Sequence, residues 1–525
     1  MIDMASGTPK TLQEDNLRKE ITSIGKKSTV YVVGQGISRA VGFFMIPVYT
    51  RFIAPVNYGA LELYEILTAT VAIIISMGVA ESMSRFYYAE KDQDKRNQVV
   101  STIIVGFSII GVFLTLIFLS ISGIIATIVL DSAQYRYYLQ IAMAATWFSM
   151  LCEIGYSYLR MCYQAKTFVT FTTIQIVIAL SLNIYFIVFL HLDILGILYS
   201  TLITQAIIGS ILSVMILKNV GLKVTGSFLR SLIHFGLPLV PTRITMMLGF
   251  VSNRFFLRWF TSTDPIFALS QVGLFSLGHK FGVVINSFVS VPFNSFWGPR
   301  KLEIILENEP GAKETIARVC TYATILTIYL ALILSSGIES LTEIMADSSY
   351  QGAHKVVPFV ALAYVALGLE AHFITGILYK KKTILSTYIS ILSLSVILVW
   401  NYFFVPRYGL IGAATSNLAG FAVRGTLIYM VSQRLFFIPF ELVRLAIMFI
   451  VASLLYGISQ FIWFSSPYTT FLVRIGIGAF FPFVLFCVHF YTEGEIEFAK
   501  QFIRKMLGFK PFIPKVDQIS QGNDE

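Results

Sequence analysis

Charged residues are scarce in this sequence. Asp, Glu, Lys and Arg together account for 13% of the 525 residues, whereas soluble domains carry about 25%. Hydrophobic residues make up 56%, and they form runs long enough to cross a bilayer core of about 30 Å as helices. The alternating polarity of a membrane-spanning barrel is missing. The sequence therefore predicts an all-α integral membrane protein rather than a series of soluble domains.

Motifs for catalysis, metal binding and nucleotide binding are also missing. The four cysteines Cys152, Cys162, Cys320 and Cys487 lack the paired spacing of a disulfide framework or a zinc site. "GKKST" at 25 lacks the upstream glycine of a phosphate-binding loop, and "GQGISR" at 34 lacks the third glycine of a dinucleotide fingerprint. The outer loops are too short for a large catalytic loop. We therefore expect a carrier, with no enzymatic activity, no cofactor and no metal site.

The apolar runs predict about fourteen transmembrane helices. With the N-terminus in the cytoplasm, inside segments hold 26 of the 39 Lys and Arg residues and outside loops hold 6. This excess of positive charge predicts that both termini of the multi-pass protein are cytoplasmic. It also explains most of the net charge of +10, so no nucleic-acid partner is needed. The predicted spans are 28–50, 59–83, 98–119, 138–159, 168–189, 194–217, 232–253, 266–297, 315–336, 356–378, 384–405, 410–431, 441–463 and 470–491.

The chain repeats itself at an offset of 216 residues. "DSAQYRYYL" at 131 matches "DSSYQGAHK" at 347, "YQAKT" at 163 matches "YKKKT" at 379, and "DILGILYST" at 193 matches "GLIGAATSN" at 409. The repeat predicts two pseudo-symmetric six-helix bundles around a central cavity, related by an axis along the membrane normal, with two additional C-terminal helices. The expected divisions are a tail at 1–27, bundles at 28–217 and 232–431 joined by a linker at 218–231, added helices at 441–491, and an amphipathic helix and tail at 492–525.

Ionisable residues inside the spans predict the functional site, because they are costly unless they face a cavity or a partner. The cations would line a cavity that favours an anion such as phosphate, and the carboxylates would couple an ion or form structural pairs. Structural pairing, for example of Arg39 with Glu62 or Glu65, stays open for every charge, as does snorkelling of Arg51 and Arg254. Two prolines should bend the seventh span and act as a hinge. The candidates are the cations Arg39, Arg51, Arg243, Arg254 and Lys280, the carboxylates Glu62, Glu65, Glu153 and Glu370, and the prolines Pro238 and Pro241.

Three stretches resemble the polysaccharide-exporter (Wzx-type) branch of the MOP flippase superfamily: "IPVYTRFIAPVNYGALELYEIL" at 46, "FGLPLVPTRI" at 235 and "GLIGAATSNLAG" at 409. The first carries the run Tyr-Thr-Arg-Phe-x-x-Pro-x-x-Tyr-Gly. The resemblance covers roughly residues 25–490. It also extends to the lipid II flippase, because fourteen spans exceed the twelve of many exporters. Multidrug exporters of the MATE type usually have an acidic residue in the first span, where this chain has Arg39.

The resemblance implies a flippase that moves undecaprenyl-diphosphate-linked oligosaccharide from the inner to the outer leaflet by alternating access. Its product would serve O-antigen, capsule or exopolysaccharide assembly. A proton or sodium gradient would drive it, membrane lipids would surround it, and polymerase and chain-length proteins of the same pathway would be its partners. The alternatives are a lipid II flippase and, from other classes, a membrane enzyme or a scaffold of glycan assembly.

Overall fold

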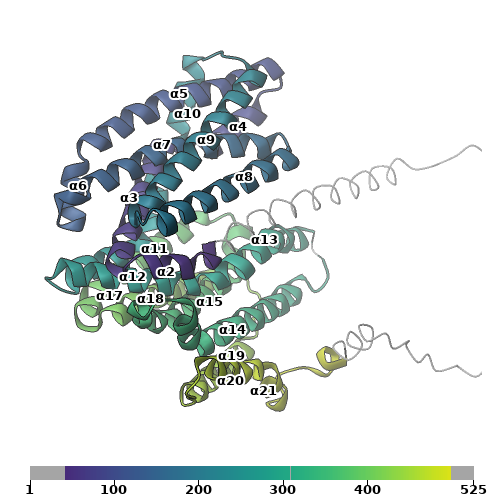
Figure 1. Ribbon diagram of the computed structural model, residues 1–525. Helices are drawn as coiled ribbons and strands as arrows, with labels where there is room; N and C mark the ends of the chain where they lie inside the picture. Colours follow the sequence, from purple (N-terminus) through teal and green to yellow (C-terminus); the bar gives the residue numbers. More distant parts are fainter. Residues whose placement is uncertain (1–41, 308, 498–525) are drawn as a thin grey trace, which may run out of the picture.

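The computed structural model describes residues 42–307 and 309–497, and every regular element in them is a helix (Figure 1). The N-lobe, α3 to α10, lies above the C-lobe, α11 to α18, and α19 to α21 cover the far side of the C-lobe. The bounds of α2 and the N-lobe helices are α2 Ile46–Phe52, α3 Pro55–Ser76, α4 Val79–Ala89, α5 Gln93–Ser120, α6 Ser122–Leu130, η1 Ala133–Tyr135, α7 Arg136–Met161, α8 Ala165–Ile184, η2 Tyr185–Phe189, α9 Ile194–Val220 and α10 Gly226–Gly236. Those of the remaining helices are α11 Leu239–Phe260, α12 Pro265–Gly282, η3 Asn286–Ser290, α13 Val291–Leu306, α14 Ala312–Met345, η4 Ser348–Val356, α15 Val357–Phe373, α16 Thr375–Tyr379, α17 Thr383–Tyr408, α18 Leu410–Leu435, α19 Leu442–Gln460, α20 Pro467–Ala479 and α21 Phe481–Cys487.

The helices of the described residues identify a multi-pass membrane protein. Eleven of them are long and apolar enough to cross a membrane. Two further helices, α7 and α18, each have 26 residues and richer polar content. Most of the first predicted span, the tail at 1–27 and nearly all of the C-terminal amphipathic helix and tail lie outside the described residues. The count of fourteen spans therefore stays a prediction.

The internal repeat has a clear counterpart in the backbone. Asp193 begins α9 with φ 53° and ψ −130°, and Gly409 begins α18 with φ 52° and ψ −121°. These two residues are 216 positions apart. Asp131 and Asp347, separated by the same offset, each precede a short 3-10 helix and then a long helix, α7 or α15. The two halves of the chain thus repeat these two turns and the helices that follow them at the offset found in the sequence.

Gly409 provides a test of this turn. A Cβ at Gly409 would meet only Thr261 Cγ2, at 4.0 Å. Gly409→Ala should therefore destabilise the protein only through strain in the backbone of residue 409, without a steric clash. We expect a loss of about 1–3 kcal/mol in the free energy of unfolding, because the conformation is one that non-glycine residues rarely adopt. The measurement is thermal unfolding in detergent. Gly425→Ala in the middle of α18 is the control, since its Cβ would be 3.8 Å from the nearest atom; equal loss in both variants would contradict the prediction.

The chain changes lobes at Leu237 and Pro238. Helix α10 packs against α4 and α5, whereas α11 packs against α12, α17 and α18. Phe235 and Gly236 contact Phe86 and Met77 of the N-lobe, and the domain boundary expected at residue 232 stays a prediction. Pro238 precedes α11, and Pro241 lies in its first turn. The predicted interruption of the helix is present, and its action as a hinge stays a prediction.

Candidate site between the two lobes

The lobes contact each other closely where α3 crosses α12. A Cβ added to Gly59 would lie 2.0 Å from the carbonyl oxygen of Leu269, and a Cβ added to Gly273 would lie 2.0 Å from that of Pro55. We call this the glycine contact. Next to it the rings of Tyr58 and Tyr350 meet edge to face at 5.9 Å. Only residues without a side chain allow two helix backbones to approach this far, so Gly59 and Gly273 determine how the lobes meet at this end of α3.

A second set of contacts joins the lobes at the other end of α3. A Cβ on Gly78, which follows α3, would lie 3.1 Å from Leu239 Cδ1 of α11. Arg243 of α11 forms an ion pair with Glu81 of α4. Glu153 of α7 lies close enough to interact electrostatically with both of these side chains. The interface is therefore held at both ends of α3, with a stretch of the helix between them.

Ionisable side chains from both lobes occupy that middle stretch, and we call them the central cluster. Arg254 is 2% exposed; its Nη2 lies 3.5 Å from Glu62 Oε1, and its guanidinium stands 4.8 Å from the ring of Phe275. Its Nη1 donates hydrogen bonds to the carbonyl of Phe250 and to Asn253 Oδ1, at 2.8 and 2.9 Å. The members of the cluster are Glu62 and Glu65 of α3, Arg254 of α11, and His279 and Lys280 of α12.

Lys280 connects the cluster to the glycine contact. Its ammonium lies 4.7 Å from the centre of the Tyr58 ring, and it interacts with both Glu62 and Glu65. Glu65 is exposed, and it lines a cavity of about 130 Å³ between α3, α7 and α9. The N-lobe thus supplies the carboxylates of the cluster and the C-lobe supplies the cations. Separation of the lobes would free two cations for an anionic ligand.

The structure brings only some of the predicted site residues together. Glu62, Glu65, Arg254 and Lys280 meet in the central cluster, and Arg243 and Glu153 share the second set of contacts. The remaining predicted residues lie elsewhere: Arg51 is exposed in the last turn of α2, Glu370 of α15 pairs with Arg424 of α18 at 3.0 Å inside the C-lobe, and Arg39 falls outside the described residues.

Three contributors were not identified from the sequence as members of the site. The sequence does not mark Glu81 as a site residue, and its pairing with Arg243 is visible only in the tertiary structure. His279 directly precedes the predicted Lys280, and its Nε2 lies 3.2 Å from the Tyr364 hydroxyl. Arg258, one helical turn after Arg254, forms an ion pair with Asp131 of the N-lobe. The spacing of four residues was the signal that could have found it.

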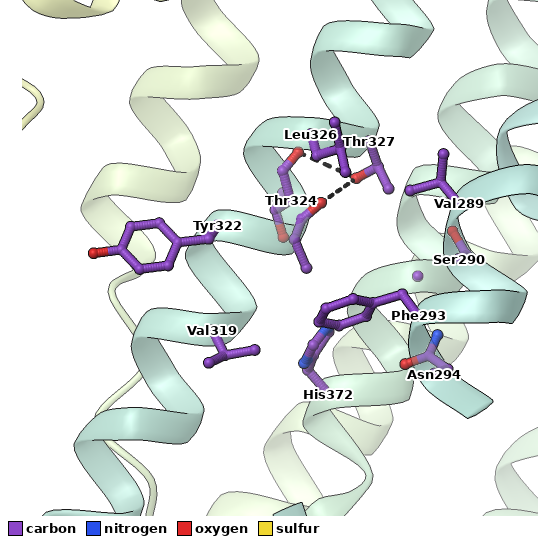
Figure 2. A pocket seen from close by; sticks show the side chains of 12 residues that line it. Val289, Ser290, Phe293, Asn294, Val319, Tyr322, Thr324, Leu326, Thr327 and His372 are labelled. Atoms are coloured by element: carbon purple, nitrogen blue, oxygen red, sulfur yellow. Dashed lines mark hydrogen bonds between the residues drawn. The ribbon is translucent and has the colours of Figure 1, made fainter. Parts of the chain in front are cut away.

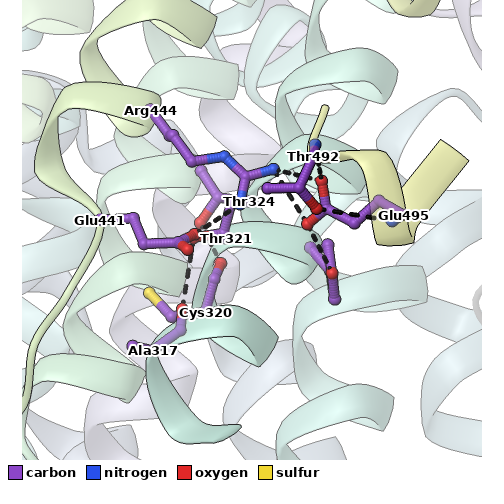
Figure 3. Close-up of polar contacts among 9 residues, drawn as sticks. Ala317, Cys320, Thr321, Thr324, Glu441, Arg444, Thr492 and Glu495 are labelled. Carbon is purple, nitrogen blue, oxygen red and sulfur yellow. Dashed lines mark hydrogen bonds and ion pairs between the residues drawn. The ribbon is translucent and has the colours of Figure 1, made fainter. Parts of the chain in front are cut away.

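A separate polar network holds the C-terminal helices to the C-lobe (Figure 3). Arg444 of α19 bonds Glu441 at 2.9 Å and Glu495, beyond α21, at 2.8 Å. From α14, Thr321 donates to Glu441 at 2.6 Å and Tyr322 donates to Glu495 at 2.7 Å. Partial burial opposes ionisation of Glu495, but the hydrogen bonds from Tyr322, the Thr492 backbone and Arg444 outweigh it and lower its pKa. The network is therefore complete at neutral pH and is lost as the pH falls through this lowered pKa.

Arg444→Met should release this network. We expect amide hydrogen exchange in residues 492–497 to become about tenfold faster, since the ion pairs that hold them to α19 are gone. Hydrogen exchange followed by mass spectrometry makes the measurement, with Arg434→Met as the control because Arg434 is exposed on α18. Unchanged exchange in Arg444→Met would show that apolar packing alone holds the segment.

Comparison with known proteins agrees with this architecture. Residues 24–301 match the family model described as polysaccharide biosynthesis protein. A lipid II flippase, MurJ, in an inward closed conformation superimposes with a TM-score of 0.67 at 14% identity, covering 90% of this chain and 99% of that one. An inward-facing multidrug resistance transporter of the MATE family superimposes with a TM-score of 0.55 at 14% identity, covering 75% and 94%. At these identities the two structures show the fold alone. No curated protein sequence matches the chain.

Proposed function

Because the chain belongs to the polysaccharide biosynthesis protein family, we propose that it is a flippase for undecaprenyl-diphosphate-linked oligosaccharides. It would move the repeat unit from the inner to the outer leaflet of the cytoplasmic membrane, with both termini in the cytoplasm. The product would then pass to polymerase and chain-length proteins for O-antigen, capsule or exopolysaccharide assembly. The family and the shared fold support a carrier of this class.

The central cluster is the observation that carries the proposal. A lipid-linked diphosphate needs cations at membrane depth, where charges are expensive unless they are paired. Arg254 and Lys280 are held there by Glu62, by Glu65 and by aromatic rings. When the lobes separate, the diphosphate replaces the carboxylates as the partner of these cations. The cations are therefore paired both with and without cargo, which keeps the cost of opening low.

The contacts at both ends of α3 support a cycle of alternating access. The glycine contact and the Arg243–Glu81 pair would break in turn, so that the central cluster opens to one side of the membrane at a time. The interruption at Leu237 and Pro238 would permit the lobes to rotate. A proton or sodium gradient would supply the energy, and Glu65, which lines its own cavity, is the carboxylate placed to take up the coupling ion.

Lipid II transport is the second candidate. It is favoured by the superposition on MurJ, because the match covers 90% of this chain and 99% of that structure. Both cargoes carry a diphosphate, so the central cluster fits either one. The two candidates differ in the lipid that accumulates when the protein is absent.

The test is the sidedness of lipid-linked glycan after depletion of the protein. Right-side-out spheroplasts are probed with a lectin or glycosidase that cannot cross the membrane. We expect lipid-linked repeat units to accumulate and to be shielded from the probe. Accumulation of accessible repeat units would place the protein after translocation and refute the proposal, and accumulation of shielded lipid II would select the second candidate.

A further inference from the structure

Two cavities flank the seam between α15 and the η3–α13 segment of the C-lobe. One, of about 350 Å³, is lined by residues of α13, α14 and α15 (Figure 2). The other, of about 420 Å³, lies across the seam and is lined by α13 and α15. Ser290, Asn294 and Gly368 line both of them. Each volume falls in the range of small-molecule sites, about 300–1,000 Å³.

Buried polar atoms without hydrogen-bond partners collect along this seam. They are Ser290 Oγ, Asn294 Oδ1, Glu370 Oε2 and His372 Nδ1, and all four residues line one or both cavities. Ser290 and Glu370 are 5% exposed and His372 is 2% exposed. Buried polar groups are nearly always satisfied, so a cluster of unsatisfied ones beside a cavity indicates the place of a polar ligand.

The chemistry of the lining favours a neutral ligand with many hydroxyl groups. The carboxylate of Glu370 is balanced by Arg424 at 3.0 Å, and the buried ammonium of Lys301 donates to the carbonyl of Ala371. The charged groups beside the cavities therefore already have protein partners. Asn294 Oδ1 and Glu370 Oε2 accept, while the Ser290 hydroxyl can both donate and accept. Phe293, whose ring centre is 5.9 Å from that of His372, adds an aromatic face (Figure 2). Hydroxyl groups both donate and accept, and the carbon face of a sugar ring can lie on an aromatic ring.

The seam also lies on the same continuous helical segment as the central cluster. Lys280 is in α12, and Ser290 and Asn294 follow it through η3 into α13. Fourteen helical residues span about 21 Å at 1.5 Å each. A diphosphate at Lys280 would therefore leave room for several sugar units before the seam.

We infer that the seam of Ser290, Asn294, Gly368 and His372 is a binding site for neutral sugar units of the cargo distant from the diphosphate. The inference rests on the proposed function and adds a second recognition point to it. The central cluster binds the diphosphate common to every cargo. The seam binds the distant sugar units, and its affinity depends on the length of the glycan and the positions of its hydroxyl groups. Recognition of the complete repeat unit thus depends on two points about 20 Å apart on one helical segment.

The experiment uses the full-length chain in proteoliposomes with two lipids. One is undecaprenyl diphosphate carrying a single sugar, and the other carries a neutral oligosaccharide. Asn294→Leu and Ser290→Ala should each slow transport of the oligosaccharide lipid about tenfold, the change expected from hydrogen bonds worth about 1.4 kcal/mol. Transport of the single-sugar lipid should stay within about twofold, which also shows that the variants fold.

Two further variants sharpen the result. Gly368→Leu removes no polar atom but fills the seam, and it should reproduce the selective loss. Ser335→Ala is the matched control, because Ser335 is buried in the C-lobe but lines a different cavity. Equal slowing of both lipids, or of neither, would overturn the inference. Transport of neither lipid by the unaltered chain would refute the proposed function instead, and this inference with it.

Discussion

Gly59→Ala and Gly273→Ala should each abolish transport. A Cβ at either position would lie 2.0 Å from a backbone carbonyl oxygen of the other lobe, and a backbone cannot yield as a side chain can. Overpacking typically costs about 1–3 kcal/mol. Because the obstacle is backbone, we expect the upper end of that range, which lowers the population of the contacted state about 100-fold. A carrier that cannot close one end of its interface cannot complete its cycle.

Separation of the lobes at the glycine contact in these variants can be measured as a distance as well as through transport. Spin labels on Ala54 and Ile266, both exposed at the start of α3 and α12, should report a longer distance in either variant, in a background without the four cysteines. Gly249→Ala is the control, because Gly249 lies inside α11 and a Cβ there would meet nothing within 4 Å. Normal transport together with an unchanged label distance in Gly59→Ala would show that the lobes do not rely on this contact.

Arg254→Met should cause the largest loss of stability. The substitution removes one of the two cations that face the largely buried Glu62 carboxylate, and breaking a buried ion pair costs about 3–5 kcal/mol. The double variant Arg254→Met with Glu62→Met should recover most of this loss, since two apolar side chains of similar volume leave no unpaired charge. Thermal unfolding in detergent measures stability, and transport is measured on the same samples.

Recovery of stability without recovery of transport is the result that separates the two roles of Arg254. The pair is then structural in the contacted state, and the guanidinium is needed by the cargo in the open state. Arg300→Met is the control, because Arg300 forms only exposed ion pairs with Glu303 and Glu309, and such pairs contribute little. Transport by the double variant at the normal rate would remove Arg254 from the proposed diphosphate site.

Local patterns in the sequence were sufficient to identify a multi-pass helical membrane protein. Continuous apolar runs identify the membrane helices because the backbone of a spanning segment must satisfy its own hydrogen bonds. The constant offset of 216 residues identifies the two equivalent lobes, since it preserves turns such as those at Asp193 and Gly409. Pro238 marks the interruption before α11 because proline cannot continue a helix without losing a hydrogen bond.

The tertiary structure alone decided which charges became partners. Periodicity places Glu62 and Glu65 on one face of α3, but it does not specify their partners. The described contacts join Glu62 to Arg254 and both carboxylates to Lys280, while Arg39 lies outside the described residues. Glu370, expected near the same cavity, pairs with Arg424 instead. A helical period specifies the direction in which a side chain points along its own axis. The facing side chain depends on how two lobes pack, and that packing is set by backbone contacts such as Gly59 against Leu269.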